Sequence, residues 1–404
     1  MRKPGKVDAC VLGDVDLLRP VALAGISATV VARPGTPTSY SRLADHSIEW
    51  ADHWTQTEVL VERLLEFASH QPEPPVLYYQ STGDLMMISR NRERFARAFR
   101  FVLADAQLIE DVTDKARFHQ LATRLEIQVP RTAIMRPADD PTGWKAADHE
   151  FPLLLKPVVR QFDKWGALAP DAKAITVATR SELAELWPRL AELDLELLAQ
   201  ELISGPETMI ESYHTYIDDA ERVVADFAGR KLRTRPQRFG YSTAVTLTDA
   251  PDVLELGRDV AQRLGLTGVA KIDFKRNERG DLLLLEVNPR FTLWHHPAAL
   301  AGLNIPALVF ADLTRRRRPE PGSANPGVRW CSPWEDAAAA RESGELGVGW
   351  LLGTLRCEAK YGLSWRDPMP FVRGVAIPRL RARSRRWLRR RRTSRRPAPS
   401  EQRS

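Results

Sequence analysis

The chain has 404 residues and a formal net charge of +7, but residues 379–404 alone carry 12 Arg and one Glu, so the other 378 residues sum to −4. A mildly acidic body with a basic tail argues against a domain coated by nucleic acid. Three distant cysteines exclude a disulfide scaffold and a Cys-rich zinc site. The N-terminus has no apolar stretch like the core of a signal peptide, and no run in the chain approaches the length of a membrane span.

The first hundred residues alternate between predicted strands and helices. Short β-branched segments predict strands at 7–12, 28–32 and 75–79, and the spacing of apolar residues predicts helices at 58–69 and 91–102. This alternation is typical of a small parallel α/β unit, and without a GxGxxG sequence it gives no support for dinucleotide binding. The helix at 58–69 is expected to carry Val59, Leu60, Arg63, Leu64 and Phe67 on one face.

The middle of the chain mixes both kinds of element. We expect mainly helix over 105–132, then a strand at 151–156, a loop at 158–170 and a strand at 175–178. A helix at 182–193, with Ser181 as its N-cap, and a strand at 197–203 should follow. The last expected elements are a helix at 252–264 and strands at 269–275 and 282–287. After Thr314 a basic run and then a Pro-, Gly- and Ser-rich stretch follow, so we place a domain boundary there.

Residues 269–290 predict a hairpin with two facing carboxylates. Strand side chains alternate between two faces, so Asp273 shares its face with the lysines two residues before and after it. A four-residue loop over 278–281 would pair Asn277 with Leu282, and this register places Asp273 opposite Glu286. Directly opposed side chains lie about 5 Å apart at Cβ, so these carboxylates should repel each other.

A bound cation would remove this repulsion. Asp273, Glu286 and the amide oxygen of Asn288 are hard oxygen ligands, which suit Mg²⁺ held together with substrate phosphates. Arg290 would add a fixed positive charge for a phosphate or a developing oxyanion. An exposed hairpin with solvated acids is the alternative for any one of these residues, but their grouping favours a metal site.

This pattern resembles the ATP-grasp superfamily, in which an acid on one strand precedes a Glu-x-Asn-x-Arg sequence on the next. The resemblance implies an α/β ATP-grasp architecture, in which an N-terminal parallel α/β domain precedes two α+β lobes that clamp ATP. The implied units are the N-terminal domain at 1–112, the ATP-grasp domain at 113–314 with lobes at about 130–200 and 201–314, a C-terminal extension at 315–378 and an Arg-rich, disordered tail at 379–404.

The resemblance also implies roles for the hairpin residues. Asp273 would bind one Mg²⁺ ion, Glu286 would bridge two ions and Asn288 would bind the second, with Mn²⁺ as a possible substitute. Arg290 would contact the γ-phosphate or the tetrahedral intermediate.

Further candidates lie upstream. Lys156 resembles the family's phosphate-binding lysine, and a lysine near the loop at 158–170, Lys173 or Lys164, would cover the phosphates. The backbone near 201–203 would bind adenine, and the pair Asp114-Lys115 matches one found in the carboxylate–amine ligase branch. A solvated surface is the alternative for each. The implied ATP-binding residues are Lys156, Lys173, Gln200, Glu201, Leu202, Ile203 and Glu207, and the implied catalytic residues are Arg290, Lys231 and Arg233.

The implied activity is ATP-dependent ligation of a carboxylate to an amine through an acylphosphate, with release of ADP and phosphate. D-aspartate ligase-like enzymes are the expected relatives, and the substrates would be small or peptide-like acids and amines. The alternatives are an ATP-binding sensor or scaffold without catalysis, and a protein whose basic tail binds nucleic acid or a membrane surface.

The tail has two interpretations. Residues 379–396 contain few large apolar residues, so the segment either binds an anionic membrane, where each Arg contributes about 1 kcal/mol, or stays solvated and disordered. Nucleic acid is the disfavoured partner because the body is acidic, and a homodimer is also considered. We expect a cytoplasmic protein, either free or peripheral to the inner face of a membrane.

Overall fold

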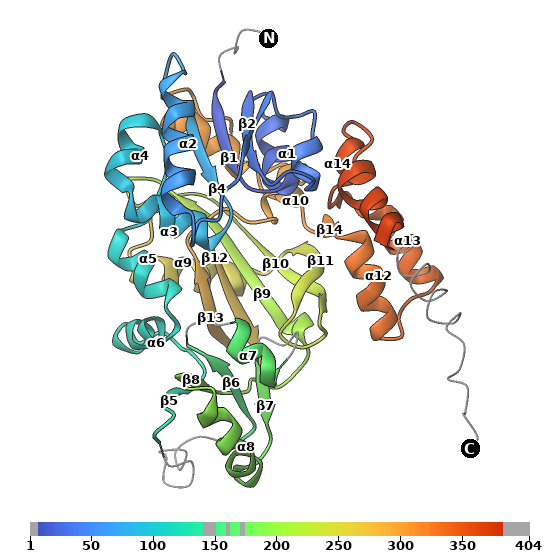
Figure 1. Cartoon of the computed structure of the whole chain (residues 1–404). Coiled ribbons are helices and arrows are strands. Elements are labelled where there is room, and N and C mark those ends of the chain that lie inside the picture. Colours follow the sequence, from blue (N-terminus) through green and yellow to red (C-terminus); the bar gives the residue numbers. More distant parts are fainter. Residues whose placement is uncertain (1–6, 140–150, 159–161, 170–173, 321, 383–404) are drawn as a thin grey trace, which may run out of the picture.

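Three β-sheets organise the chain (Figure 1). The computed structural model describes residues 7–139, 151–158, 162–169, 174–320 and 322–382. A parallel sheet forms the N-terminal domain, a four-stranded antiparallel sheet forms a small lobe, and a seven-stranded sheet forms the large lobe and continues into the C-terminal extension. This arrangement confirms the predicted ATP-grasp architecture.

The N-terminal sheet is entirely parallel, with the strand order β3-β2-β1-β4. Strands β1, β2 and β4 are buried along their whole length, which explains their continuous apolar sequences. The elements are β1 Ala9–Leu12, α1 Val15–Leu23, β2 Ala28–Ala32, η1 Pro37–Tyr40, β3 His46–Glu49, α2 Thr57–Ser69, β4 Val76–Tyr79, α3 Thr82–Arg90 and α4 Arg92–Ala98. The parallel unit expected from the alternating pattern is therefore confirmed.

Two details of this domain differ from expectation. The core face of α2 consists of Leu60, Val61, Leu64 and Ala68, so it is rotated relative to the predicted face and Val59 is exposed. Helix α3 was not expected, although Ser81 forms a capping box with Asp84 at its start. The cap places the first turn of α3 directly after β4, at the edge of the cavity described below.

The expected helix over 105–132 is two helices followed by a strand. Asp114 ends α5 (Ala106–Thr113) and caps α6 (Lys115–Arg124), where its carboxylate accepts hydrogen bonds from the backbone N–H groups of Ala116 and Arg117. The break at Asp114 directs Lys115 toward the small lobe, where its ammonium donates to the carbonyl of Pro157.

The small lobe has the strand order β5-β8-β6-β7 and its own apolar core. Its elements are β5 Thr132–Met135, β6 Leu153–Pro157, α7 Phe162–Leu168, β7 Ile175–Val177, α8 Arg180–Glu192 and β8 Leu197–Glu201. The loop expected over 158–170 is wrong in its described part, because α7 occupies residues 162–168. Trp165 on this helix and Ala169 directly after it are both buried. Thr179 caps α8 in place of the predicted Ser181.

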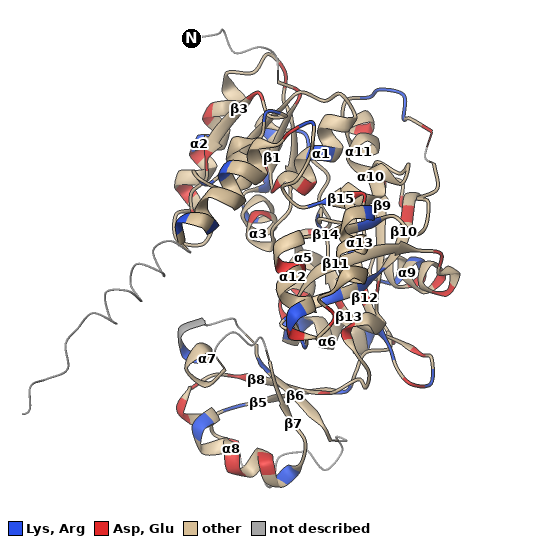
Figure 2. Ribbon diagram, turned by 90° about the vertical axis from the view of Figure 1, so that its right-hand side faces the viewer, with Lys and Arg blue, Asp and Glu red and all other residues tan. Residues whose placement is uncertain are grey.

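The large sheet has the order β13-β12-β9-β10-β11-β14-β15. Its elements, with the helices packed on it, are η3 Glu207–Met209, β9 Ile210–Ile217, β10 Val223–Arg235, β11 Tyr241–Thr248, α9 Pro251–Arg263, β12 Gly268–Arg276, β13 Leu282–Asn288, α10 His295–Leu300, α11 Ile305–Leu313, β14 Arg329–Cys331 and β15 Ala359–Lys360. Figure 2 shows the small lobe below this sheet, with charged residues on the outer helix α8. Gly265 ends α9 with a positive φ of 63°, as expected.

The C-terminal extension is tied to the large sheet. Its elements are α12 Pro333–Glu342, α13 Val348–Arg356, α14 Met369–Phe371 and a short π-helix, η4 Val372–Ala376. Strands β14 and β15 extend the sheet beyond β11, so residues after the predicted boundary at Thr314 still belong to it. Within the part of the chain described, no helix is long and apolar enough to cross a membrane.

Candidate active site

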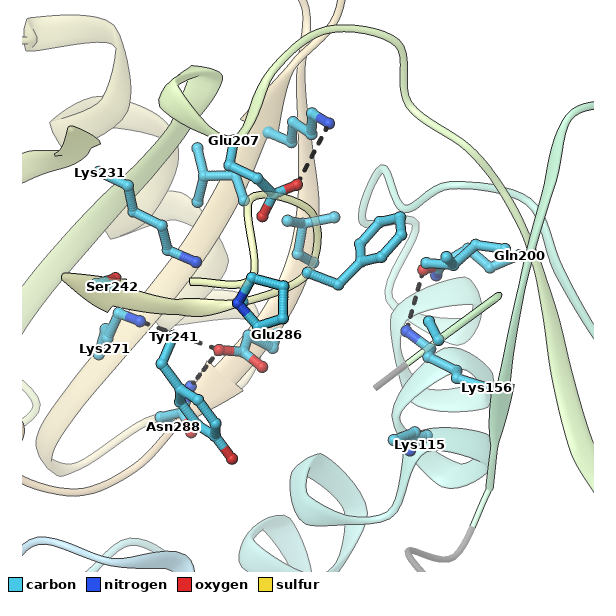
Figure 3. A pocket seen from close by; sticks show the side chains of 18 of the residues that line it. Lys115, Lys156, Gln200, Glu207, Lys231, Tyr241, Ser242, Lys271, Glu286 and Asn288 are labelled. Carbon is cyan, nitrogen blue, oxygen red and sulfur yellow. Dashed lines mark hydrogen bonds and ion pairs between the residues drawn. The ribbon is translucent and has the colours of Figure 1, made fainter. Parts of the chain in front are cut away.

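A cavity of about 850 Å³ lies where the small lobe, the large sheet and the N-terminal domain meet. Strands β6 and β8 and helix α7 line it on one side, strands β10 to β13 on the other, and the start of α3 at its edge. Figure 3 shows Lys115 and Lys156 facing Lys231, Lys271 and Glu286 across this space. Ten of the predicted site residues line it, namely Lys156, Gln200, Glu201, Leu202, Ile203, Glu207, Lys231, Glu286, Asn288 and Arg290.

The β12–β13 hairpin presents the predicted metal face. Asp273 lies opposite Glu286, as predicted, but Leu282 pairs with Arg276 and not with Asn277. The turn is one residue longer than expected, and an irregularity between Asp273 and Phe274 shifts the register back. The predicted pairing of Asp273 with Glu286 is confirmed, because the longer turn and the irregularity shift the register in opposite directions.

The two carboxylates have different surroundings. Asp273 is buried, accepts a hydrogen bond from Ser212 Oγ at 2.5 Å, and lies 2.5 Å from Lys271 Nζ. Burial raises the pKa of Asp273, but the lysine charges, chiefly Lys271, outweigh this and hold the pKa below its ordinary value. Glu286 lines the cavity, 4.0 Å from the same Lys271 Nζ, and accepts a hydrogen bond from the Asn288 amide at 3.1 Å. Lys271 is therefore the cation that separates the two acids here.

The residues that reach the cavity fit a magnesium ion. Glu286 and Asn288 offer a carboxylate and an amide oxygen on one face, and Mg²⁺ is commonly held by one or two carboxylates together with substrate phosphates. No three His, Cys, Asp or Glu side chains in the described ranges are grouped to hold a metal by themselves. Phosphate oxygens would have to complete the coordination, and Asp273 would join only if Lys271 moved.

Lys156 lies at the end of β6 in a strongly cationic environment. Its Nζ donates to the side-chain oxygen of Gln200 at 3.1 Å, and Gln200 in turn donates to Thr132 Oγ at 3.0 Å. Burial, followed by the charge of Lys115, lowers the pKa of Lys156 to about 8. A partly desolvated ammonium held by a neutral amide beside a second lysine is suited to an anionic ligand.

The connection from β8 into η3 forms another wall of the cavity. Leu202 and Ile203 line the cavity with apolar surface, and Glu207 follows them at the start of η3. Lys275 Nζ lies 4.0 Å from Glu207 and donates to the carbonyl of Gly205 at 2.9 Å. This wall therefore combines apolar surface, backbone polar groups and a carboxylate.

Arg290 connects the hairpin to the N-terminal domain. Its guanidinium donates to the carbonyl of Gln80 at 2.7 Å, to Thr82 Oγ at 3.3 Å and to Asn288 Oδ1 at 3.0 Å. Burial lowers its pKa, while Glu286 and other nearby acids oppose this effect. Arg290 thus positions Asn288 as well as placing positive charge at the cavity.

Two predicted residues do not line the cavity. Arg233 binds Asp336 through two contacts of 2.8 and 2.7 Å and Glu345 at 2.9 Å, so it attaches β10 to the C-terminal extension. Asp273 lies behind the lining, as described above. Lys173 lies outside the described residues.

Several lining residues were not among the predicted site residues. Lys271 and Lys275 are two of them, and Lys115 was predicted only as part of the Asp114-Lys115 pair. With these three lysines the lining has six cationic side chains against three carboxylates. Strand alternation had already placed Lys271 and Lys275 on the face of Asp273, so that signal was available. Tyr241 and Ser242 had no local signal, because they reach the cavity only where β11 pairs with β10.

The chain is similar to known proteins over most of its length. A model of the family described as "ATP-grasp in the biosynthetic pathway with Ter operon" matches residues 196–332. A D-aspartate ligase of Enterococcus faecium (strain Aus0004) is 24% identical over 289 residues, 68% of this chain and 68% of that ligase. A D-alanine–D-alanine ligase of Pseudomonas fluorescens (strain Pf0-1) is 26% identical over 219 residues, and the match spans 50% of this chain and 62% of that ligase.

The fold likeness extends further. The ADP complex of N5-carboxyaminoimidazole ribonucleotide synthetase superposes with a TM-score of 0.61 at 14% identity, covering 85% of this chain and 87% of that chain. The three-sheet architecture, the family model and the ligase relatives agree with one another. Residues 196–332 match an ATP-grasp family, and the chain as a whole has the ATP-grasp fold.

Proposed function

We propose that the protein is an ADP-forming ligase that joins a carboxylate to an amine. The observation that carries this proposal is the cavity between the lobes, where six cationic side chains outnumber three carboxylates. A triphosphate would neutralise this excess charge, and the apolar wall near Leu202 and Ile203 would accept a nucleobase. The relatives named as D-aspartate and D-alanine–D-alanine ligases support the same class of reaction.

The proposed reaction has two steps. A carboxylate oxygen of the first substrate attacks the γ-phosphorus of ATP, the bond to the β-phosphate oxygen breaks, and ADP leaves an acylphosphate behind. The nitrogen of the amine then attacks the acyl carbon, loses a proton and expels phosphate. Most of the catalysis would come from positioning and charge neutralisation, so no nucleophilic Ser or Cys is required.

Each side of the cavity would serve a different part of ATP. Lys156 and Lys115, from the small-lobe side, would bind the phosphates, and Lys231 and Arg290 would hold the transferred phosphoryl group and the carboxylate. Magnesium bound by Glu286 and Asn288 would neutralise phosphate charge during transfer. Because the acylphosphate hydrolyses in water, the cavity between the two lobes would also have to exclude solvent.

An ADP-release screen tests this proposal. Wild-type protein is incubated with ATP, Mg²⁺ and pairs of acids and amines, beginning with D- and L-amino acids because the relatives are named for D-amino acids. We expect ADP release that requires both partners, and mass spectrometry should detect the condensed product. A protein that binds ATP but releases no ADP with any pair would be a sensor or scaffold, and this result would overturn the ligase proposal.

A further inference from the structure

Lys271 lies in the middle of the proposed magnesium face of the β12–β13 hairpin. On β12 it is opposite Asn288 of β13, and Asp273, two residues further along β12, is opposite Glu286. The Lys271 ammonium lies 2.5 Å from Asp273 Oδ2 and 4.0 Å from Glu286 Oε1. One ammonium therefore lies between the two carboxylates, where a bound metal ion would otherwise separate them.

The same lysine separates Asp273 from the cavity. Lys271 lines the cavity with a side chain that is 12% exposed, whereas the Asp273 side chain, at 2%, lies behind it. Glu286 is 59% exposed. Figure 3 shows Lys271 reaching toward Glu286 beside Asn288. A cation that enters from the cavity can therefore reach Glu286 directly, but it reaches Asp273 only if the lysine moves.

Free Mg²⁺ gains little by displacing this lysine. The contact of Lys271 with the buried Asp273 is charge-assisted, and contacts of this kind are stronger than those between neutral groups. Lys231 is a second positive charge that acts on Asp273, so the ion would also enter a cationic environment. Because Mg²⁺ gives up its water reluctantly, the hairpin alone offers too few oxygens to offset these costs.

A triphosphate reverses this balance. Its oxygens complete the coordination of the metal, and its negative charge offers the ammonium a new partner. Lys271 already lines the cavity in which the phosphates would lie, so its flexible side chain can turn to them from Asp273. Each cation then has an anionic partner, and the two acids are free to hold the metal.

We infer that Lys271 holds the metal position until a nucleotide binds, so that Mg²⁺ reaches Asp273 and Glu286 only together with ATP. Lys271 is thereby a positioning residue that makes metal binding conditional on the nucleotide. The coupling is reciprocal, so the metal in turn strengthens the binding of ATP. The inference rests on the metal site of the proposed function, but not on which acid and amine are joined.

Lys275 provides the matched control. It lies on the same strand and lines the same cavity, so its removal lowers the charge of the lining by the same amount. Its ammonium, however, donates to the carbonyl of Gly205 at 2.9 Å and lies 4.0 Å from Glu207. The variant Lys275→Met therefore leaves Lys271 between the two hairpin carboxylates.

Equilibrium dialysis of the full-length protein against Mn²⁺, without nucleotide, tests the inference. The wild type is compared with Lys271→Met, Lys271→Gln and Lys275→Met, and the double variant Lys271→Met/Glu286→Gln locates the bound ion. A further sample of the wild type contains a non-hydrolysable ATP analogue. Circular dichroism and thermal unfolding establish that the proteins are folded, and Lys271→Gln keeps a hydrogen-bond donor for Asp273 in case the methionine variant is not.

Without nucleotide, we expect both Lys271 variants to bind Mn²⁺ about tenfold more tightly than the wild type, because a competing charge has left the site. Lys275→Met should bind no more tightly than the wild type, and the double variant should lose the gain. Mn²⁺ should also raise the unfolding temperature of the Lys271 variants without nucleotide, but not that of the wild type. The analogue should bring Mn²⁺ to the wild type.

Equal Mn²⁺ binding by the wild type and the Lys271 variants would overturn the inference. An equal gain in Lys275→Met would also overturn it, because total charge and not the position of Lys271 would then decide. A gain that survives in the double variant would place the ion elsewhere, with the same consequence. Failure of the wild type to bind Mn²⁺ even with the analogue would refute the metal site itself. None of these measurements needs turnover, so a failed ADP-release screen would leave their result standing.

Discussion

Raising the pH should weaken nucleotide binding through Lys156. Burial and the charge of Lys115 hold its pKa at about 8 in the free site, against an ordinary value of 10.5. Bound phosphates would supply the missing countercharge and raise this pKa again, so ATP should bind the charged lysine preferentially. Above about pH 8 the Lys156 ammonium of the free site loses its proton. Linkage then predicts that ATP binds on the order of tenfold more weakly at pH 9.5 than at pH 7.5.

His119, next to Lys156, should not produce this dependence. Burial and the charge of Lys156 hold the pKa of His119 at about 4, so this imidazole stays neutral throughout the window. Because the folded-state pKa of Lys156 is depressed, the unfolded chain binds more protons between about pH 8 and 10.5. The contribution of Lys156 to stability therefore rises with pH in this window, and the loss of affinity does not come from unfolding of the site.

Titration calorimetry with a non-hydrolysable ATP analogue, at constant ionic strength, measures this effect. Lys156→Gln should bind more weakly at pH 7.5 and should lose most of the decline toward pH 9.5. The matched control Arg189→Gln removes an exposed cation on α8 that does not line the cavity, and it should keep the wild-type pH profile. An unchanged pH profile in Lys156→Gln would refute the reasoning, because the titrating group would then be elsewhere.

Three further predictions concern the site and its support. Glu286→Gln should lower ATP turnover about a hundredfold or more without unfolding the protein, because an amide replaces the cavity-facing carboxylate; ADP release measures this. Arg233→Met should lower the free energy of unfolding in denaturant by about 3 kcal/mol, because Asp336 is then a buried carboxylate without its charged partner. Gly257→Ala should lower it by about 1–3 kcal/mol, because the new Cβ would lie 2.2 Å from the Tyr213 ring.

Matched variants separate these effects from general damage. Glu278→Gln, on the exposed turn of the same hairpin, should retain ATP turnover. Arg235→Met removes only exposed ion pairs and should cost less than about 1 kcal/mol. Gly353→Ala, on α13, meets no neighbouring atom and should not destabilise the protein. A control that lost as much as its partner would contradict the corresponding assignment.

The hairpin illustrates how far local patterns reach. The alternation of strand side chains was sufficient to place Glu286 and Asn288 on one face, and the pairing of Asp273 with Glu286 followed from the turn length. The turn itself was one residue longer, and a compensating irregularity restored the register. A pattern of alternation reports which face a residue occupies, but it does not report whether that face is open or buried. Asp273 was for this reason expected in the cavity and lies behind it.

The sequence by itself determined the parallel N-terminal unit, the hairpin with Asp273 opposite Glu286, the lysine at the end of β6 and the separation of charge between body and tail. Each depends on periodicity or composition among near neighbours. Only the tertiary structure decided that Arg233 binds Asp336, 103 residues away, and that Lys115 joins Lys156 at the cavity. Both juxtapositions depend on how distant segments pack, because the fold decides which charged side chains come within reach of one another, and no local pattern records that.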